Sequence, residues 1–469
     1  MFSSLNLSNV NYIVWKDIYK VIDFFDGNAE LDLLVDIDHK QKFEGIIFNN
    51  GFISLRVHSL LVKKGIEHYI KYSNGKYFHL HVYYNLITGN HFVKEYEFPI
   101  EKSLFSNYTL QNNIKVASKE LEIAFLVTRL IIKKSLFFQN IKTKELKRLA
   151  NLSKTCDEKS LIKLINEISP KIKASFFELL SVALDKKIIS NKNRIILKEF
   201  SNYKTLKGIS YAFKYIWIRT VLMFLRLSKS SNKTIKHKGI SFALLGSDGS
   251  GKTTISSKVY KQYSAKSSCR KFYLGGNFKT YSIGTRLCYF NYYFMRVLSP
   301  FKDKYYLAWL FYYNSFAMLE LGKANDRKRK IVRGNKLKTK GWVVIYERFP
   351  IVNLFDFPNK LLKLKKHPWF LCSSSKIIRA LIHKIEKTFE NIEKPDVSFL
   401  IVTDLEKMKE RRVLAPNELI DIDRKLKSQK QYLTNNKANL IVIENNGELD
   451  SVINAINQEI NNKICISSL

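Results

Sequence analysis

The stretch LLGSDGSGKTT, residues 244–254, determines which fold we predict for the second half of this 469-residue chain. Its first two residues are the end of the apolar run ISFALL, residues 240–245, which is suited to a buried parallel strand. The pattern G-x-x-x-x-G-K-T follows from Gly246 to Thr253, and residues 254–263 can then form a helix. A strand, a glycine-rich loop and a helix in this order are the context that a phosphate-binding loop requires.

Each part of this loop is suited to holding phosphate. Glycine lets backbone N–H groups curl around phosphate oxygens, and the N-terminus of the following helix adds the positive end of its dipole. We expect Lys252 to reach the β- and γ-phosphates of ATP and Thr253 to ligate Mg²⁺. The residues that we predict to bind the nucleotide are Gly246, Ser247, Asp248, Gly249, Ser250, Gly251, Lys252, Thr253 and Thr254.

The loop and the segments after it resemble thymidylate kinases and their relatives. Asp248 fits the G-x-D-G-x-G-K-T-T form that the loop takes in that family. Residues 341–350, GWVVIYERFP, resemble the family's strand that ends in D-R-Y or D-R-F. Residues 394–402, KPDVSFLIV, resemble its Pro-Asp pair before an apolar strand. Nearly all of residues 238–462 are covered by the resemblance.

Other segments extend this resemblance. Tyr432 and the strand at residues 439–443 match the family's C-terminal helix and last strand. The pair Asp326-Arg327 stands where thymidylate kinases carry an Asp-Arg that helps to hold the acceptor, although a coincidence in this strongly basic run explains the match equally well. Four residues fall at the spacing of the start of the family's lid, namely Asp404, Glu406, Arg411 and Arg412.

The resemblance implies a role for each candidate residue. Arg348 would grip the acceptor's phosphate, because a guanidinium contacts an oxyanion at two points, and Asp248 would face the acceptor's sugar. Arg411 and Arg412 would close over the transferring group. Glu347 stands where the family has Asp, linked to Mg²⁺. The predicted catalytic residues are Lys252, Glu347, Arg348, Arg411 and Arg412, with Thr253 and Glu347 at the metal.

We therefore predict an ATP- and Mg²⁺-dependent phosphotransferase, of which dTMP + ATP → dTDP + ADP is the nearest named activity. Residues 353–358, NLFDFP, follow the arginine motif as in thymidylate-kinase-like proteins from bacterial surface-polysaccharide clusters. The acceptor is therefore open between a nucleoside monophosphate and a sugar or other polysaccharide precursor. A regulatory protein that binds ATP without turning it over is a further alternative.

The N-terminal region carries a second group of polar residues. An Asn-Gly turn at residues 74–75 predicts a hairpin between residues 67–73 and 77–86. Two pairs of side chains each share one face of a strand, Glu30 with Asp32 and His79 with His81. This resembles the nucleotidyltransferase superfamily, in which a D-x-D strand and a third carboxylate hold two metal ions. Because histidine replaces the third carboxylate here, we interpret the region as a degenerate or regulatory domain rather than a working transferase.

These patterns divide the chain into three parts. We expect residues 1–110 to form a smaller α+β domain that resembles nucleotidyltransferases, and residues 111–235 a helical region that ends in a serine-rich linker at 228–233. Residues 236–469 are expected to form the domain that resembles thymidylate kinases. The predicted fold class is α/β, with a P-loop kinase-like parallel sheet that carries helices on both faces.

Composition adds broader expectations. Lys and Arg number 79 against 41 Asp and Glu, a formal net charge of +38, which attracts polyanions. No recognised nucleic-acid-binding module accompanies this charge, so we expect no specific nucleic acid partner. The five cysteines form no C-x-x-C pair, which together with the lack of a secretory signal favours a reducing, cytoplasmic location. The oligomeric state is open.

Two apolar segments bear on membrane contact. Residues 305–319 are too short and too interrupted for a span, so we expect a buried helix. Residues 210–227 predict a helix with a wide apolar face and basic margins at Lys214, Arg219 and Arg226. Such a helix fits either a peripheral contact with an anionic membrane or docking against the flanking domains, and we favour docking.

Overall fold

The computed structural model describes residues 1–57, 62–73, 76–90, 93–100, 102–134, 143–184, 191–224, 233–236, 238–350, 364–411, 422 and 440–466. The chain forms two compact units, Met1–Lys233 and Thr234–Ser468, and the short strand β10 (Lys233–Ile235) lies at the division. Several predicted features fall outside the described residues. These are the turn at 74–75, the linker at 228–232, residues 353–358, Arg412 and Tyr432.

Unit 1 contains a mixed sheet with the strand order β3-β4-β5-β2-β1-β9-β8. Its strands are β1 (Tyr12–Lys16), β2 (Glu30–Val35), β3 (Ile53–Val57), β4 (Ile66–Ser73), β5 (Lys76–Tyr83), β8 (Tyr108–Gln111) and β9 (Ile114–Ala117), and β6 (Leu86–Thr88) pairs separately with β7 (Tyr96–Phe98). Strands β4 and β5 are antiparallel, which confirms the predicted hairpin. Strand β2 runs parallel to β5, so Glu30 lies opposite His79 and Asp32 opposite His81.

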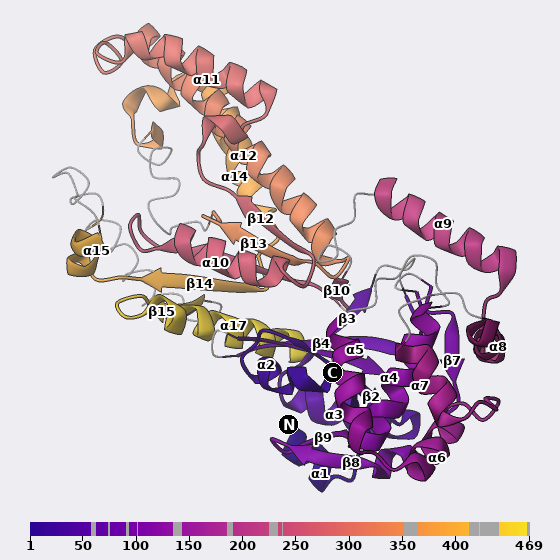
Figure 1. Cartoon of the computed structure of the whole chain (residues 1–469). Coiled ribbons are helices and arrows are strands. Elements are labelled where there is room, and N and C mark those ends of the chain that lie inside the picture. The colour runs from indigo at the N-terminus through magenta and orange to yellow at the C-terminus, as the bar shows by residue number, and fades with distance from the viewer. Residues whose placement is uncertain are drawn as a thin grey trace. The chain divides into compact units, whose positions relative to one another are not determined.

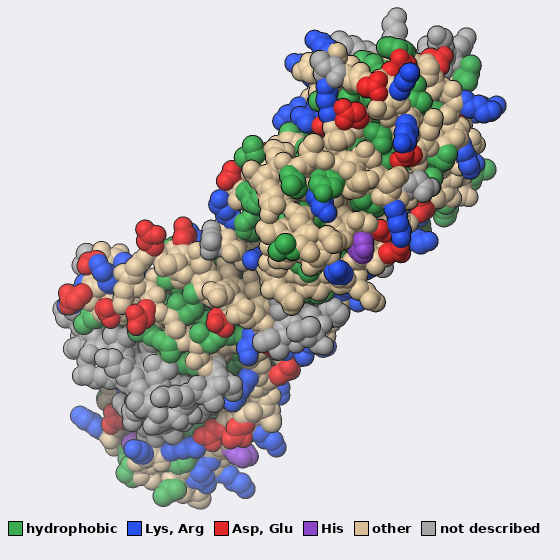
Figure 2. All heavy atoms as spheres, turned by 90° about the horizontal axis from the view of Figure 1, so that it is seen from below, with side chains coloured by type: hydrophobic (Ala, Val, Ile, Leu, Met, Phe, Trp, Pro, Cys, Tyr) green, Lys and Arg blue, Asp and Glu red, His purple; other side chains and the backbone are tan. Residues whose placement is uncertain are grey.

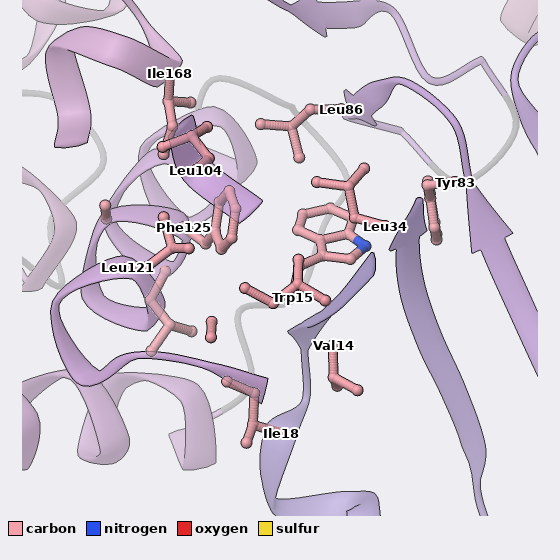
Figure 3. Close-up of a cluster of buried hydrophobic side chains, with 14 of the residues drawn as sticks. Val14, Trp15, Ile18, Leu34, Tyr83, Leu86, Leu104, Leu121, Phe125 and Ile168 are labelled. Atoms are coloured by element: carbon pink, nitrogen blue, oxygen red, sulfur yellow. The ribbon is translucent and has the colours of Figure 1, made fainter. Parts of the chain in front are cut away.

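Helices pack on this sheet around one hydrophobic core (Figures 1 and 3). The ring of Trp15 on β1 lies 5.6 Å from that of Phe125 on α4 (Lys119–Lys134) and 5.1 Å from that of Tyr83 on β5, measured between centroids. The helices are α1 (Phe2–Leu7), α2 (Val21–Phe25), α3 (Lys40–Asn49), α4 (Lys119–Lys134), α5 (Thr143–Leu152), α6 (Glu158–Ile168), α7 (Phe176–Leu184), α8 (Asn191–Phe200) and α9 (Gly208–Phe224). The helical series predicted from residue 111 starts only at Lys119, because residues 108–117 form the β8–β9 hairpin.

Unit 2 contains a parallel sheet with the strand order β12-β13-β11-β14-β15. Its strands are β11 (Ile240–Leu245), β12 (Cys269–Tyr273), β13 (Val343–Glu347), β14 (Val397–Val402) and β15 (Leu440–Glu444). The described helices are α10 (Lys252–Ser264), α11 (Ile283–Met295), α12 (Tyr306–Lys338), α14 (Lys376–Glu390), α15 (Leu405–Arg411) and α17 (Leu449–Ile466). All six residues of β11 are buried, so both faces of the sheet are covered, as predicted for a continuous apolar strand.

The segment expected to be a buried helix is the first part of the 33-residue helix α12. One of its faces is buried, with Trp309 at 0% exposure, whereas Leu307 and Phe311 are 64% and 53% exposed. The expected helix is therefore present, buried on one face and exposed on the other. The second half of α12 is basic and continues the helix through Gly334, where a Cβ atom would lie 2.1 Å from the hydroxyl oxygen of Tyr346.

On the face drawn in Figure 2, Lys and Arg side chains lie among Asp, Glu and apolar side chains rather than in one continuous basic area. Within the described ranges, no helix has both the length and the apolar character that crossing a membrane requires.

Candidate active site

The glycine-rich loop leaves the carboxyl end of β11 and leads into α10. Gly246, Gly249 and Gly251 have φ angles of +147°, +91° and +85°, which residues with side chains rarely adopt. A Cβ atom on Gly246 would lie 2.6 Å from the carbonyl oxygen of Ile401, and one on Gly251 would lie 2.7 Å from Asn445 Nδ2. The loop therefore requires glycine where the sequence pattern has it.

Lys252 begins α10, and its side chain is buried beside the loop, with 5% exposure. Its ammonium donates a hydrogen bond to the carbonyl oxygen of Ser247 and lies 3.4 Å from Ser250 Oγ. An ammonium held over the loop by oxygen acceptors is placed to contact phosphate oxygens, which are stronger acceptors than a carbonyl. The N-terminus of α10 adds backbone N–H groups that favour an anion at the same point.

Glu347, the last residue of β13, directs its buried carboxylate at the first turn of α10. Its Oε1 accepts a hydrogen bond from Thr253 Oγ1 at 2.5 Å, and its Oε2 accepts one from Ser256 Oγ at 3.2 Å. Lys271 Nζ on β12 lies 3.8 Å from Oε2. The structure thus brings together the two predicted metal ligands, Thr253 and Glu347, and adds Lys271, which the sequence did not single out.

Arg348 follows Glu347 in the left-handed backbone region, with φ of +61°. That conformation costs a non-glycine residue about 1–2 kcal/mol, so the surrounding structure has to hold it. Its guanidinium lies 2.9 Å from Asp248 Oδ1 and 5.7 Å from the centre of the Tyr273 ring. The side chains of the ion pair are 43% and 39% exposed, and pairs this open contribute little to stability. Arg348 can therefore exchange Asp248 for another anion at a small cost.

Two side chains from neighbouring strand ends hold the loop, and sequence reasoning missed both. Thr403 follows β14 and donates from Oγ1 to the Ser250 carbonyl oxygen at 3.4 Å, and Asn445 follows β15 and donates from Nδ2 to the same oxygen at 2.9 Å. Arg411 on α15 donates to the Asn445 carbonyl oxygen at 2.7 Å, which places it beside the loop. A polar residue directly after a buried parallel strand is the signal that could have found Thr403 and Asn445.

The Asp-Arg pair on α12 contacts the segment that follows β12. Arg327 Nε donates to the carbonyl oxygen of Leu274 at 2.9 Å. Asp326 Oδ2 accepts the backbone N–H of Ser282 at 3.0 Å. Arg327 thus holds the chain directly after Tyr273, and Asp326 holds it further on at Ser282.

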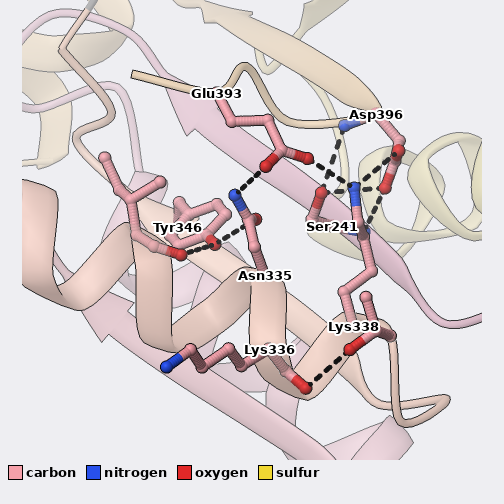
Figure 4. Close-up of polar contacts among 9 residues, drawn as sticks. Ser241, Asn335, Lys336, Lys338, Tyr346, Glu393 and Asp396 are labelled. Carbon is pink, nitrogen blue, oxygen red and sulfur yellow. Dashed lines mark hydrogen bonds and ion pairs between the residues drawn. The ribbon is translucent and has the colours of Figure 1, made fainter. Parts of the chain in front are cut away.

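The Pro-Asp pair lies at the opposite edge of the sheet, where β14 begins. Asp396 Oδ2 accepts from both the backbone nitrogen and Oγ of Ser241 at 2.8 Å, and Asp396 Oδ1 lies 3.2 Å from Lys338 Nζ (Figure 4). Glu393 receives a hydrogen bond from Asn335 at 2.7 Å. These contacts tie the starts of β11 and β14 to the end of α12, roughly 20 Å along the strands from the loop.

The remaining predicted residues of the site are peripheral. Asp404 Oδ2 accepts from Asn446 Nδ2 at 2.8 Å, and Glu406 lies 3.1 Å from Lys409 Nζ on the exposed side of α15. Thr254 is exposed in the first turn of α10. The side-chain contacts of Asp404 and Glu406 are therefore with surface neighbours.

Unit 1 brings its carboxylates and histidines together on β2, β4 and β5. His79 Nδ1 lies 2.9 Å from Glu30 Oε1, and His81 Nδ1 lies 2.9 Å from Asp32 Oδ1. The ring of His68 is stacked on that of His81, with centroids 4.4 Å apart, and its Nδ1 lies 3.1 Å from His79 Nε2. Within the described parts of the chain, no group of three or more His, Cys, Asp or Glu side chains is arranged to hold a metal ion.

The electrostatics of this cluster favour neutral imidazoles beside an ionised carboxylate. Burial lowers the pKa of all three histidines, that of His79 to about 4. Burial opposes the ionisation of Asp32, but Lys16 and His81 outweigh it and hold the pKa of that carboxyl well below its usual range. Each carboxylate is therefore engaged by a histidine of the neighbouring strand.

The residues around the loop of unit 2 fit a nucleotide and a hard divalent cation. Mg²⁺ prefers oxygen ligands and is usually bound through one or two carboxylates together with substrate phosphates. Glu347 and Thr253 place a carboxylate and a hydroxyl oxygen side by side, next to the loop and Lys252. This donor set matches that preference.

Among the comparisons with known proteins, the search of solved structures found matches. No family model matches the chain, and no curated protein matches it. The chain is similar to a thymidylate kinase from Candida albicans, with 14% identity, 49% of this chain and 94% of that chain covered, and a TM-score of 0.29. It is also similar to a thymidylate kinase from Ehrlichia chaffeensis, with 16% identity, 48% and 99% covered, and a TM-score of 0.25. Likenesses at this identity and TM-score carry no argument about activity, for which the contacts around the loop are the relevant observations.

Proposed function

We propose that unit 2 is an ATP- and Mg²⁺-dependent phosphotransferase of the nucleoside monophosphate kinase type, with dTMP + ATP → dTDP + ADP as the first reaction to test. The proposal rests on four groups that lie together at one edge of a parallel sheet. These are the glycine loop, the ammonium of Lys252, the carboxylate of Glu347 and the guanidinium of Arg348, which can exchange Asp248 for another anion. Phosphoryl transfer depends on positioning and charge neutralisation, which these groups provide.

The donor side of the site is the loop. The β- and γ-phosphates of ATP would lie against the loop amides, and Lys252 would turn from the Ser247 carbonyl oxygen to the phosphate oxygens. Thr253 and Glu347 would hold Mg²⁺, which would supply positive charge to neutralise the donor phosphates. Lys271, 3.8 Å from Glu347, keeps that carboxylate directed at the loop.

The acceptor side begins at Arg348. Its guanidinium would leave Asp248 and bind the acceptor's phosphate at two points, with the Tyr273 ring beside it. Asp248 would then be released to accept a hydrogen bond from a sugar hydroxyl. Arg411, held next to the loop by Asn445, would approach the transferring group together with Arg412 and help to exclude water.

The test is a panel of acceptors with labelled ATP and Mg²⁺, comprising dTMP, other nucleoside monophosphates and sugar phosphates. Transfer to a nucleoside monophosphate supports the proposal. Transfer only to a sugar phosphate would retain the phosphotransferase and replace its acceptor by a polysaccharide precursor. ATP binding without transfer to any acceptor would contradict the proposal and favour a regulatory nucleotide-binding protein.

A further inference from the structure

Helix α9 contacts the core of unit 1 near its start and exposes a wide apolar face. Ile218 is 2% exposed, and Tyr211 packs against the core of unit 1. Five large apolar side chains are strongly exposed, namely Ile209 at 87%, Phe213 at 70%, Ile216 at 61%, Trp217 at 55% and Met223 at 71%. With 3.6 residues per turn they fall within an arc of about 120° that is centred opposite Ile218. We call these five residues the α9 arc.

Positive charge lies on both margins of the α9 arc. Lys214 follows one edge of the arc around the helix and Arg219 precedes the other, and the helix contains no Asp or Glu. Asp248 is the single carboxylate between residues 200 and 302 of the sequence. Burial lowers the pKa of Lys63 to about 8, and the nearby charge of Lys214 adds to this lowering. An anionic surface would relieve this repulsion.

We propose that α9 binds unit 1 to an anionic lipid surface. The α9 arc would enter the boundary between headgroups and acyl chains, and Lys214 and Arg219 would contact lipid phosphates. A helix lying in this boundary has a wide apolar face with basic margins, and tryptophan is enriched at that depth. Among the described residues no helix is long and apolar enough to span a bilayer, so the proposal places α9 along the surface.

Lipid fits this face better than a second copy of the chain. Two α9 arcs facing each other would bring Lys214 and Arg219 of one copy close to the same residues of the other. Like charges at such a contact disfavour pairing. The inference is independent of the phosphotransferase activity, because α9 belongs to unit 1 and the glycine loop to unit 2.

The test uses the full-length protein and sedimentation with vesicles. One set contains phosphatidylcholine alone, and the other contains phosphatidylcholine mixed with phosphatidylglycerol. We expect binding to the mixed vesicles that weakens as salt is raised. The variant Phe213→Glu/Trp217→Glu should abolish it. Phe177→Glu is the matched control, because Phe177 is a 63% exposed aromatic residue of the same unit outside the α9 arc, and it should bind as the wild type does.

A second variant separates the charge contribution from folding. Lys214→Gln/Arg219→Gln changes only exposed polar groups and should weaken binding to mixed vesicles by about fivefold for each charge removed. Quenching of Trp217 fluorescence by brominated lipid, absent in Trp217→Phe, would place the α9 arc in the bilayer. Equal binding to both vesicle sets, binding that survives Phe213→Glu/Trp217→Glu, or a loss in that variant of self-association rather than of vesicle binding would overturn the proposal.

Discussion

Each unit has acidic side chains on a buried strand, but the groups around them differ in kind. In unit 1, Glu30 and Asp32 lie within β2 and face histidines of β5 at 2.9 Å. In unit 2, Glu347 is the last residue of β13 and faces the hydroxyls of Thr253 and Ser256 on α10, directly after the glycine loop. In unit 1 the carboxylates are paired with imidazoles within a sheet, whereas in unit 2 the carboxylate of Glu347 lies beside a loop that can bind phosphate.

This difference shows that place in the fold, more than residue type, decides what a carboxylate can bind. In a parallel sheet, ligands bind at the carboxyl ends of the strands, where loops and helix N-termini meet. Glu347 is at that edge, whereas Glu30 and Asp32 are paired along the length of β2 with a neighbouring strand. Unit 2 is therefore expected to carry the chemistry, and the following changes test that assignment.

The largest effect is expected at Lys252. The variant Lys252→Met keeps the length of the side chain but removes the charge from the phosphates, so the transfer rate should fall roughly a thousandfold while thermal stability stays close to that of the wild type. Lys258→Met is the control, because Lys258 is an exposed lysine on the same helix. Full transfer by Lys252→Met, measured with labelled ATP, would remove the loop from the active site.

The histidine cluster should make the stability of unit 1 depend on pH. The pKa of His79 is about 4 in the folded protein and near 6.5 in the unfolded chain, so the unfolded state binds more protons between these values. The free energy of unfolding is therefore unaffected by His79 above pH 6.5. It falls as the pH approaches 4, and His79 alone accounts for a loss of about 3 kcal/mol. Asp32 titrates below this window and does not offset the loss.

Urea denaturation at a series of pH values measures this loss. The charged and titratable groups near His79 are Glu30, His68, His81 and Lys233. His79→Gln removes the contribution of His79 and should make the profile less steep, even if the variant is less stable at pH 7, while His68 and His81 still lower the stability in acid. A profile as steep in His79→Gln as in the wild type would mean that another group is responsible.

Arg348→Lys should lower the acceptor-dependent rate while ATP affinity is preserved. Lysine provides only a point charge where the guanidinium forms two parallel hydrogen bonds, and losing such a contact costs about 1.5–3 kcal/mol, or roughly ten- to hundredfold in rate. Arg329→Lys on exposed α12 surface is the control. If ATP binding collapses in Arg348→Lys, Arg348 serves the donor instead.

The smallest effect is expected in unit 1. Glu30→Gln/Asp32→Asn keeps the shape of both side chains and should leave phosphotransfer within about threefold of the wild type, a change of roughly 0.7 kcal/mol in barrier. Nucleotidyl transfer by the full-length protein that is lost in this double variant would show that unit 1 is a working transferase.

Local patterns predicted the parts of the fold that depend on local chemistry. The strand, loop and helix around Gly246 follow from glycine spacing, and the β4–β5 hairpin follows from its Asn-Gly turn and flanking strands. The partners Lys271, Thr403 and Asn445 could not be found this way, because each comes from a separate strand and they meet only when the sheet forms. The length of α12 was also not predicted. The helix continues through Gly334 because the Tyr346 side chain packs closely against that glycine, and this contact exists only in the folded structure.

The central claim is that phosphotransfer depends on the carboxylate at the end of β13. The most direct measurement is the transfer rate as a function of Mg²⁺ concentration for the wild type, Glu347→Gln and Glu393→Gln. Glu393 is the control because it lies at the opposite edge of the same sheet. We predict that Glu347→Gln loses about a hundredfold in rate and requires more Mg²⁺, while Glu393→Gln behaves as the wild type. A wild-type rate and Mg²⁺ requirement in Glu347→Gln would contradict this account.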